Sequence, residues 1–128
     1  MKYATLGSME KYGVCFANVV PRPAEYEITA AEILAKYFCA NVKMVKRREN
    51  AKTADLKIKN IFWELKSPIG DGKRTIQNNL RKANSQASNI VIDLRRCKMD
   101  EWRAISRLKY ELTQAHGVKR LLVITKKG

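Results

Sequence analysis

The segment ADLKIKNIFWELKS, residues 54–67, decides how this chain folds. The runs on either side of Asn60 predict two short strands, residues 54–59 and 61–67, that meet in a tight hairpin. The polar stretch before them, residues 47–53, is expected to be a loop. The hairpin therefore forms the centre of the predicted fold.

The hairpin also carries the side chains with the most reactive chemistry. Asp55 begins its first strand, and Glu64 and Lys66 end its second. Residues two apart on a strand point to the same face, so Glu64 and Lys66 are expected side by side. Two carboxylates suit Mg²⁺, which takes its other ligands from water and substrate phosphate, and Lys66 would assist the metal-bound water. The alternative is a surface hairpin with weak cross-strand charge pairs.

The elements that flank the hairpin alternate between helix and strand. The spacing of apolar residues predicts helices at residues 25–38, 76–88 and 101–115, and further strands at 41–46, 89–94 and 118–125. The order α-β-β-β-α-β-α-β indicates an α/β (α+β) fold with a single mixed sheet flanked by helices. Residues 1–24 are expected to be an irregular lead-in, and residues 25–128 one domain.

The charge balance limits the classes of function. The 128 residues include 26 Lys and Arg against 12 Asp and Glu, a formal net charge of +14. Such a surplus suits a polyanionic partner, although a merely soluble or ribosome-like basic protein is the alternative. A hydrophobic content of 45% excludes a disordered basic tail. No apolar run reaches roughly 18 residues, so no membrane segment is expected.

Glu27 is the fourth candidate site residue. It lies on the apolar stripe of the first predicted helix, where a carboxylate is costly unless it is paired or bound to metal. Its other possible role is that of a negative charge near the helix N-terminus, where it favours the helix dipole.

Basic residues after the hairpin are candidates for nucleic-acid binding. Lys73 and Arg74 lie in a glycine-rich loop before Thr75, which is expected to be the N-cap of the next helix. A helix N-terminus points amide groups at anions, so this loop is expected to bind phosphate. Lys82 lies on the polar side of that helix. An exposed loop and a solvated helix face are the alternatives.

Other residues are assigned structural roles. Asp93 lies inside an apolar strand and needs a partner, for which Arg95 is a candidate. Trp63 and Trp102 are expected in the core, and an aromatic stacking platform for bases is the alternative. The three cysteines have no CxxC spacing, and Cys39 and Cys97 are expected to be buried free thiols, which fits a reducing cytosol. One histidine, His116, excludes a two-histidine acid–base mechanism.

Two resemblances rest on these motifs. The order α-β-β-β-α-β, with Ala54-Asp55 on one strand and Glu64-Leu65-Lys66 on the next, resembles the PD-(D/E)XK nuclease core of type II restriction enzymes, with Ala54 in place of the usual Pro. A further helix and strand follow this core. More specifically, the segments 53–55, 62–68, 75–83 and 89–94 resemble the tRNase domain at the C-termini of contact-dependent growth inhibition toxins.

The resemblance, which covers about residues 25–127, implies a metal-dependent endoribonuclease. Such domains cleave tRNA in the cytoplasm of neighbouring bacteria, are neutralised by an immunity protein, and are delivered as the C-terminal part of a large exported protein. In the nuclease core an acidic residue of the first helix often joins the metal ligands, which implies Glu27 beside Asp55 and Glu64. The charge of +14 predicts an acidic surface on the immunity protein.

The sequence is also compatible with two other functions. A metal-independent ribonuclease of the barnase/EndoU/colicin/RelE type would use Lys66, Thr75 and other basic or hydroxyl groups. A non-catalytic nucleic-acid-binding module would use the basic residues alone. DNA is not excluded as a substrate, because the restriction-like core is used on both polymers.

Overall fold

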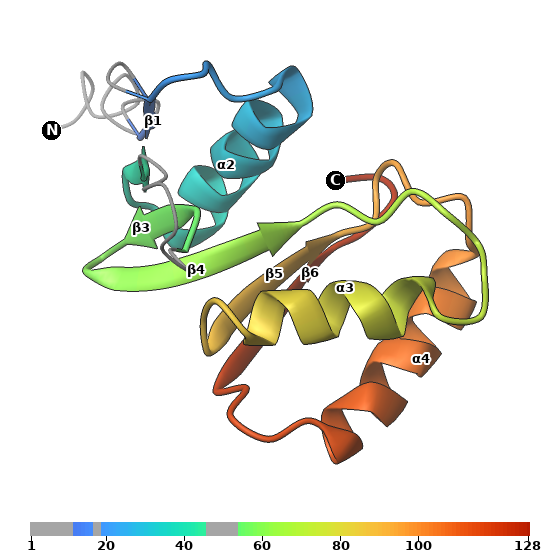
Figure 1. Cartoon of the computed structure of the whole chain (residues 1–128). Coiled ribbons are helices and arrows are strands. Elements are labelled where there is room, and N and C mark those ends of the chain that lie inside the picture. Colours follow the sequence, from blue (N-terminus) through green and yellow to red (C-terminus); the bar gives the residue numbers. More distant parts are fainter. Residues whose placement is uncertain (1–11, 17–18, 46–53) are drawn as a thin grey trace, which may run out of the picture.

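The computed structural model describes residues 12–16, 19–45 and 54–128 (Figure 1). In chain order the elements are β1 (Val14–Cys15), α2 (Glu25–Phe38), β2 (Val42–Met44), β3 (Leu56–Ile58), β4 (Ile61–Lys66), α3 (Thr75–Asn84), β5 (Asn89–Asp93), α4 (Glu101–Gln114) and β6 (Arg120–Ile124). The loop expected at 47–53 lies outside these described residues. Within them, no helix is both long enough and apolar enough to cross a membrane.

A single six-stranded sheet organises the domain, with its strands in the order β1-β2-β3-β4-β5-β6. The pairs β2–β3 and β3–β4 are antiparallel, whereas β1–β2, β4–β5 and β5–β6 are parallel. The two parallel connections after β4 and after β5 contain α3 and α4, because parallel neighbours need a long crossover. The prediction of an α+β fold with one mixed sheet is therefore confirmed.

The central hairpin turns in two residues. Lys59 and Asn60 have φ values of 50° and 67°, the left-handed backbone that the tightest hairpin turns require. Ile58 pairs with Ile61 across the turn. This short turn sets the register of β3 and β4, and the prediction of a tight hairpin at Asn60 is confirmed.

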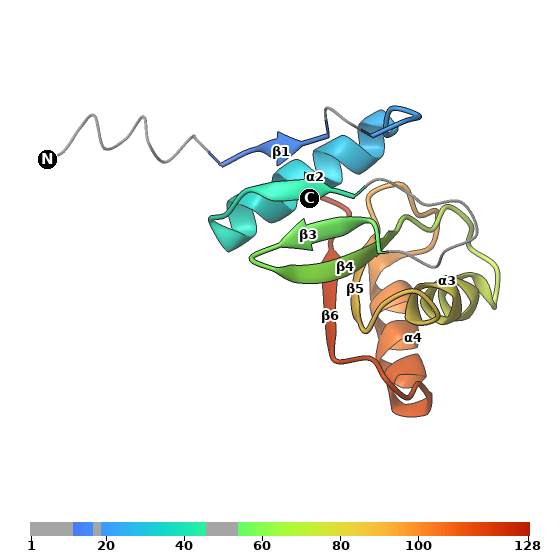
Figure 2. The same cartoon turned by 60° about the vertical axis from the view of Figure 1, so that its left-hand side comes forward.

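Helices cover the sheet on both faces (Figures 1 and 2). On one face, α2 packs against buried residues of β2, β3 and β4, and Val91 of β5 belongs to this cluster. On the other face, α3 and α4 pack against Ile90 and Ile92 of β5. All five residues of β5 are buried, which confirms the prediction of a central strand covered twice.

The N-terminal lead-in is not irregular throughout, so this prediction was wrong at residues 14–15. Val14 and Cys15 form an edge strand parallel to β2, and Val14 and Phe16 pack against the α2 cluster. The backbone N–H of Val42 donates to the carbonyl of Gly13 at 2.9 Å. A strand of two residues carries no readable periodicity, and its pairing with β2 is a tertiary effect.

Two predictions of burial were also wrong. Cys39 is exposed because α2 ends there in a left-handed residue, with φ of 49°. Trp102 is 77% exposed, whereas Trp63 and Cys97 are buried as predicted. Trp102 precedes the buried stripe of α4, which consists of Ala104, Leu108 and Glu111, and points away from it.

Asp93 and Arg95 join the end of β5 to α2. Asp93 is fully buried, and its Oδ2 lies 2.8 Å from Arg95 Nη2. Arg95 also donates to Thr29 Oγ1 at 2.9 Å and to the carbonyl of Tyr26 at 2.8 Å. Hydrogen bonding to Asp93 raises the pKa of Arg95. The structure thus gives Asp93 the partner that the sequence suggested, and with it a structural role.

Candidate active site

Asp55, Glu64 and Lys66 lie together at one end of the β3–β4 hairpin. Leu56 pairs with Trp63, so the preceding residue, Asp55, lies beside Glu64. Asp55 Oδ2 accepts a hydrogen bond from the backbone N–H of Leu65 at 3.1 Å. Lys66 Nζ lies 3.2 Å from Glu64 Oε2. The structure brings together the three residues that the sequence predicted to converge.

Both carboxylates are removed from water. Glu64 is 1% exposed and Asp55 is 8% exposed. Burial raises the pKa of Glu64 to about 7, and the charge of Asp55 acts in the same direction, while Lys66 opposes them. Two adjacent acids in a buried site repel each other when both are ionised. A cation placed between them would relieve this repulsion.

The raised pKa of Glu64 predicts a pH-dependent stability. Between the ordinary pKa of 4.5 and about 7, the folded state binds more protons than the unfolded state, so the free energy of unfolding falls as pH rises. We expect Glu64→Gln to match the wild type near pH 4 and to be more stable by about 3 kcal/mol at pH 8 in EDTA. Urea unfolding across this pH range measures the difference. Parallel stability curves for the two proteins would contradict this origin of the shift.

The residues at this site fit a Mg²⁺ ion. Mg²⁺ prefers carboxylate oxygens and is usually held by one or two protein carboxylates together with water and substrate phosphates. Asp55 and Glu64 supply such a pair, buried beside each other. In the described part of the chain, no group of three or more His, Cys, Asp or Glu residues is arranged to hold a metal. Binding of Mg²⁺ by the Asp55–Glu64 pair stays a prediction.

Glu27 has a local role in the structure. Its Oε1 accepts a hydrogen bond from the backbone N–H of Ala24 at 2.9 Å, which caps the start of α2. Glu27 is half-buried and lines a cavity of about 320 Å³ together with Asp55. It approaches from α2, whereas Glu64 alternates with the α2-facing residues Trp63 and Leu65 and so points to the other face. Its place among metal ligands remains a prediction.

The loop after β4 presents its basic residues to solvent. Lys73 and Arg74 are both exposed, and Lys82 is exposed on α3. Thr75 is not the N-cap that the sequence predicted, because Arg74 has that position and makes no side-chain capping bond. Thr75 instead packs against the loop, where a Cβ added to Gly70 would lie 3.0 Å from its Oγ1. Phosphate binding by these residues stays a prediction.

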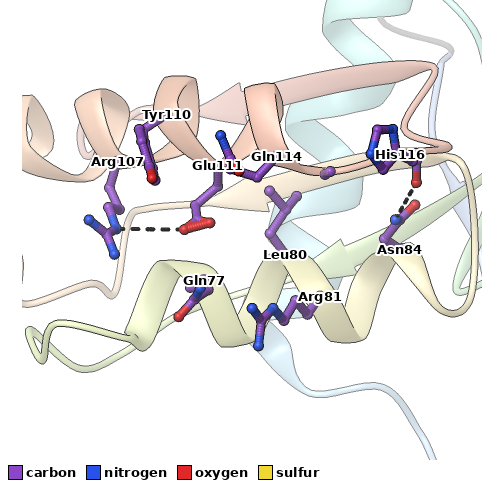
Figure 3. Close-up of a pocket in the computed structure, with 10 residues that line it drawn as sticks. Gln77, Leu80, Arg81, Asn84, Arg107, Tyr110, Glu111, Gln114 and His116 are labelled. Atoms are coloured by element: carbon purple, nitrogen blue, oxygen red, sulfur yellow. Dashed lines mark hydrogen bonds and ion pairs between the residues drawn. The ribbon is translucent and has the colours of Figure 1, made fainter.

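A second polar surface lies between α3 and α4, and the sequence reasoning missed it. Figure 3 shows side chains from both helices lining a cavity of about 450 Å³. Arg107 lies 3.9 Å from Glu111, and Asn84 donates to the carbonyl of His116 at 2.8 Å. The helical period of α4 could have revealed this surface from the sequence. It places Glu111 on the side of the helix that faces the domain and Trp102 on the side that faces solvent.

The fold, charge and site define the chain as a small, strongly basic α+β domain with a buried acidic pair at one end of a hairpin. Residues 52–128 match the family model described as the contact-dependent growth inhibition CdiA C-terminal domain. The match covers more than half of the chain, and the chain belongs to this family. Comparison with curated proteins and with solved structures found no match.

Membership of this family gives the chain a biological context. It is a CdiA C-terminal toxin domain, a kind of domain that forms part of a large exported protein and pairs with an immunity protein. The matched residues include Asp55, Glu64 and Lys66 but exclude Glu27.

Proposed function

We propose that this domain is a metal-dependent endoribonuclease that cleaves tRNA in the cytoplasm of a neighbouring bacterium. The observation that carries the proposal is the buried pair Asp55 and Glu64, with Lys66 beside it, in a domain of net charge +14. Carboxylates in a substrate site repel the phosphates of a polyanion unless a metal ion lies between them. Membership of a toxin family supports the assignment.

The arrangement of the elements supports a PD-(D/E)XK type of nuclease. The acid before β3 and the Glu-x-Lys at the end of β4 belong to neighbouring antiparallel strands, and β4 continues into a parallel pair with β5. A helix precedes this unit and another crosses between β4 and β5 on the opposite face. The order α-β-β-β-α-β, with an acid before β3 and Glu-x-Lys at the end of β4, is what supports this assignment.

Asp55 and Glu64 would hold the metal, and the contacts of both side chains support this role. The N–H of Leu65 fixes one oxygen of Asp55, and Lys66 favours the ionised form of Glu64. When bound, Mg²⁺ would polarise a phosphoryl oxygen and lower the pKa of a coordinated water. Lys66, which is 22% exposed, reaches the solvent side of the site and would stabilise negative charge that develops on the phosphate.

The charge of the domain supports a nucleic-acid substrate and an acidic inhibitor. A net charge of +14 attracts polyphosphate backbones at long range and speeds their encounter. The same field would favour an immunity protein with an acidic binding surface. Among nucleic acids we favour tRNA, and duplex DNA is the comparison that the test includes.

Incubation of the purified domain with total bacterial tRNA, and separately with duplex DNA, in Mg²⁺ and in EDTA, tests the proposal. We expect discrete fragments in Mg²⁺, none in EDTA, and cleavage at least about 100-fold slower for Lys66→Met, since a group that stabilises charge in the transition state contributes about this much. Lys43→Met, which alters an exposed lysine of β2, is the matched control and should cleave normally.

Other outcomes of this experiment separate the remaining functions. Cleavage that survives EDTA would assign the domain to the metal-independent ribonucleases. Binding of tRNA without cleavage of either tRNA or DNA would assign it to the non-catalytic modules. Cleavage of DNA alone in Mg²⁺ would support the metal-dependent mechanism but show that the substrate is DNA and not tRNA.

A further inference from the structure

The outward side of α4 exposes two large aromatic side chains. Trp102 is 77% exposed and Tyr110 is 54% exposed. They lie on the same helix, about 12 Å apart along its axis. Neither belongs to the buried stripe of α4, which the domain uses for its core. Trp102 and Tyr110 also line one cavity, so together they form an aromatic surface that a second molecule can cover.

Basic side chains surround these aromatic rings. Trp102 and Tyr110 line a cavity of about 550 Å³ with Lys73, Arg103 and Arg107. The guanidinium group of Arg107 lies 5.4 Å from the centre of the Tyr110 ring. No acidic residue is among those that line this cavity in the described structure. The surface is thus complementary to a molecule that combines flat rings with negative charge.

The same surface continues into the cavity between α3 and α4. Arg107 and Tyr110 line both cavities, so the two adjoin (Figure 3). The second cavity adds side-chain amides, Gln77 and Asn84 of α3, which can pair with the edges of bases. Its one carboxylate among the described lining residues, Glu111, is buried and paired with Arg107.

We propose that this α3–α4 surface binds single-stranded RNA, with bases stacked on Trp102 and Tyr110 and phosphates held by Lys73, Arg103 and Arg107. Stacking requires unpaired bases, because a duplex keeps its bases inside. The proposal rests on the proposed function in one respect: RNA is named as the bound polymer because RNA is the proposed substrate. The N-termini of α3 and α4 lie at the end of the sheet to which β4 and β5 point (Figure 1), so a strand bound here extends toward the loop after Lys66.

The two tryptophans provide a direct test. Trp63 is 3% exposed and Trp102 is 77% exposed, so a base that stacks on the surface quenches Trp102 selectively. The intact domain is titrated with a short unpaired RNA in EDTA, where metal-dependent cleavage cannot occur. We expect quenching, and an affinity about tenfold or more weaker for Trp102→Ala when labelled RNA is followed by anisotropy, since one stacked base contributes this much. Arg107→Gln should reduce the slope of log affinity against log salt concentration by about one, because one phosphate contact is lost.

Tyr37→Ala is the matched control, because Tyr37 is a 68% exposed aromatic residue on α2, away from this surface. It should bind RNA as the wild type does. Equal affinity of Trp102→Ala and wild type, with unchanged circular dichroism, would overturn the proposal and leave the surface to a protein partner. Quenching in EDTA, together with no cleavage of RNA in Mg²⁺, would support the RNA-binding surface and contradict the proposed function. Asp55-dependent cleavage without quenching would overturn the surface alone.

Discussion

Asp55→Asn is expected to reduce RNA cleavage by at least about 100-fold, because it removes one of the two charges that would hold the metal and leaves the rest of the site intact. An asparagine oxygen can still accept the hydrogen bond from the N–H of Leu65, which is 3.1 Å from Asp55 Oδ2 in the wild type. The loss is therefore expected in the rate and not in folding. Single-turnover cleavage of tRNA at saturating Mg²⁺, together with a thermal melt, measures both.

Glu32→Gln is the matched control for this variant. Glu32 is an exposed acid on α2, and its neutralisation should leave the rate unchanged. Glu64→Gln should lose activity as Asp55→Asn does. If Asp55→Asn cleaved tRNA within threefold of the wild-type rate, the carboxylates would have no part in the chemistry. The metal-independent alternative would then be favoured.

Arg95→Met is expected to lower the free energy of unfolding by about 3–5 kcal/mol, the usual cost of leaving a buried charge without its partner. Asp93 is fully buried, and Arg95 holds it while also bonding to Thr29 and Tyr26 of α2. A domain of this size typically has about 5–15 kcal/mol of stability, so the change removes a large share of it. Urea unfolding followed by circular dichroism measures the loss.

A second arginine provides the comparison. Arg22 lies 3.7 Å from Glu25, and both side chains are largely exposed, so Arg22→Met should cost less than about 1 kcal/mol. Adding Asp93→Asn to Arg95→Met should recover part of the lost stability, because the unpaired charge is then gone. A loss below 1 kcal/mol for Arg95→Met alone would show that Asp93 finds other partners.

Much of the fold was predictable because its signals are local. The apolar period of α2 gave the limits of the helix as observed, Glu25–Phe38, and the continuous apolar run gave β5. The strand period predicted Glu64 and Lys66 on one face, and the hairpin predicted Asp55 at the same end of the sheet. The two-residue turn at Lys59 and Asn60, which sets Asp55 opposite Glu64, was seen only in the structure.

The parts that the sequence did not predict depend on distant contacts. The strand at Val14 forms because β2 lies beside it. The sequence before residue 25 has no periodic pattern that predicts this strand. The nearly complete burial of Glu64 depends on the elements packed around β4, so its raised pKa is a property of the tertiary structure. Trp102 was assigned to the core by residue type, whereas its position on α4 places it outside.

The two-residue turn at Lys59 and Asn60 has a consequence for how this domain can change during evolution. Because the turn has only two residues, Asp55 and Glu64 lie opposite each other only if the number of residues between them stays the same. Substitutions that keep the alternation of β3 and β4 preserve the acidic pair. A single inserted or deleted residue would instead shift the register by one and turn Glu64 toward α2, where Trp63 and Leu65 now pack. Length in this hairpin is therefore constrained more tightly than composition.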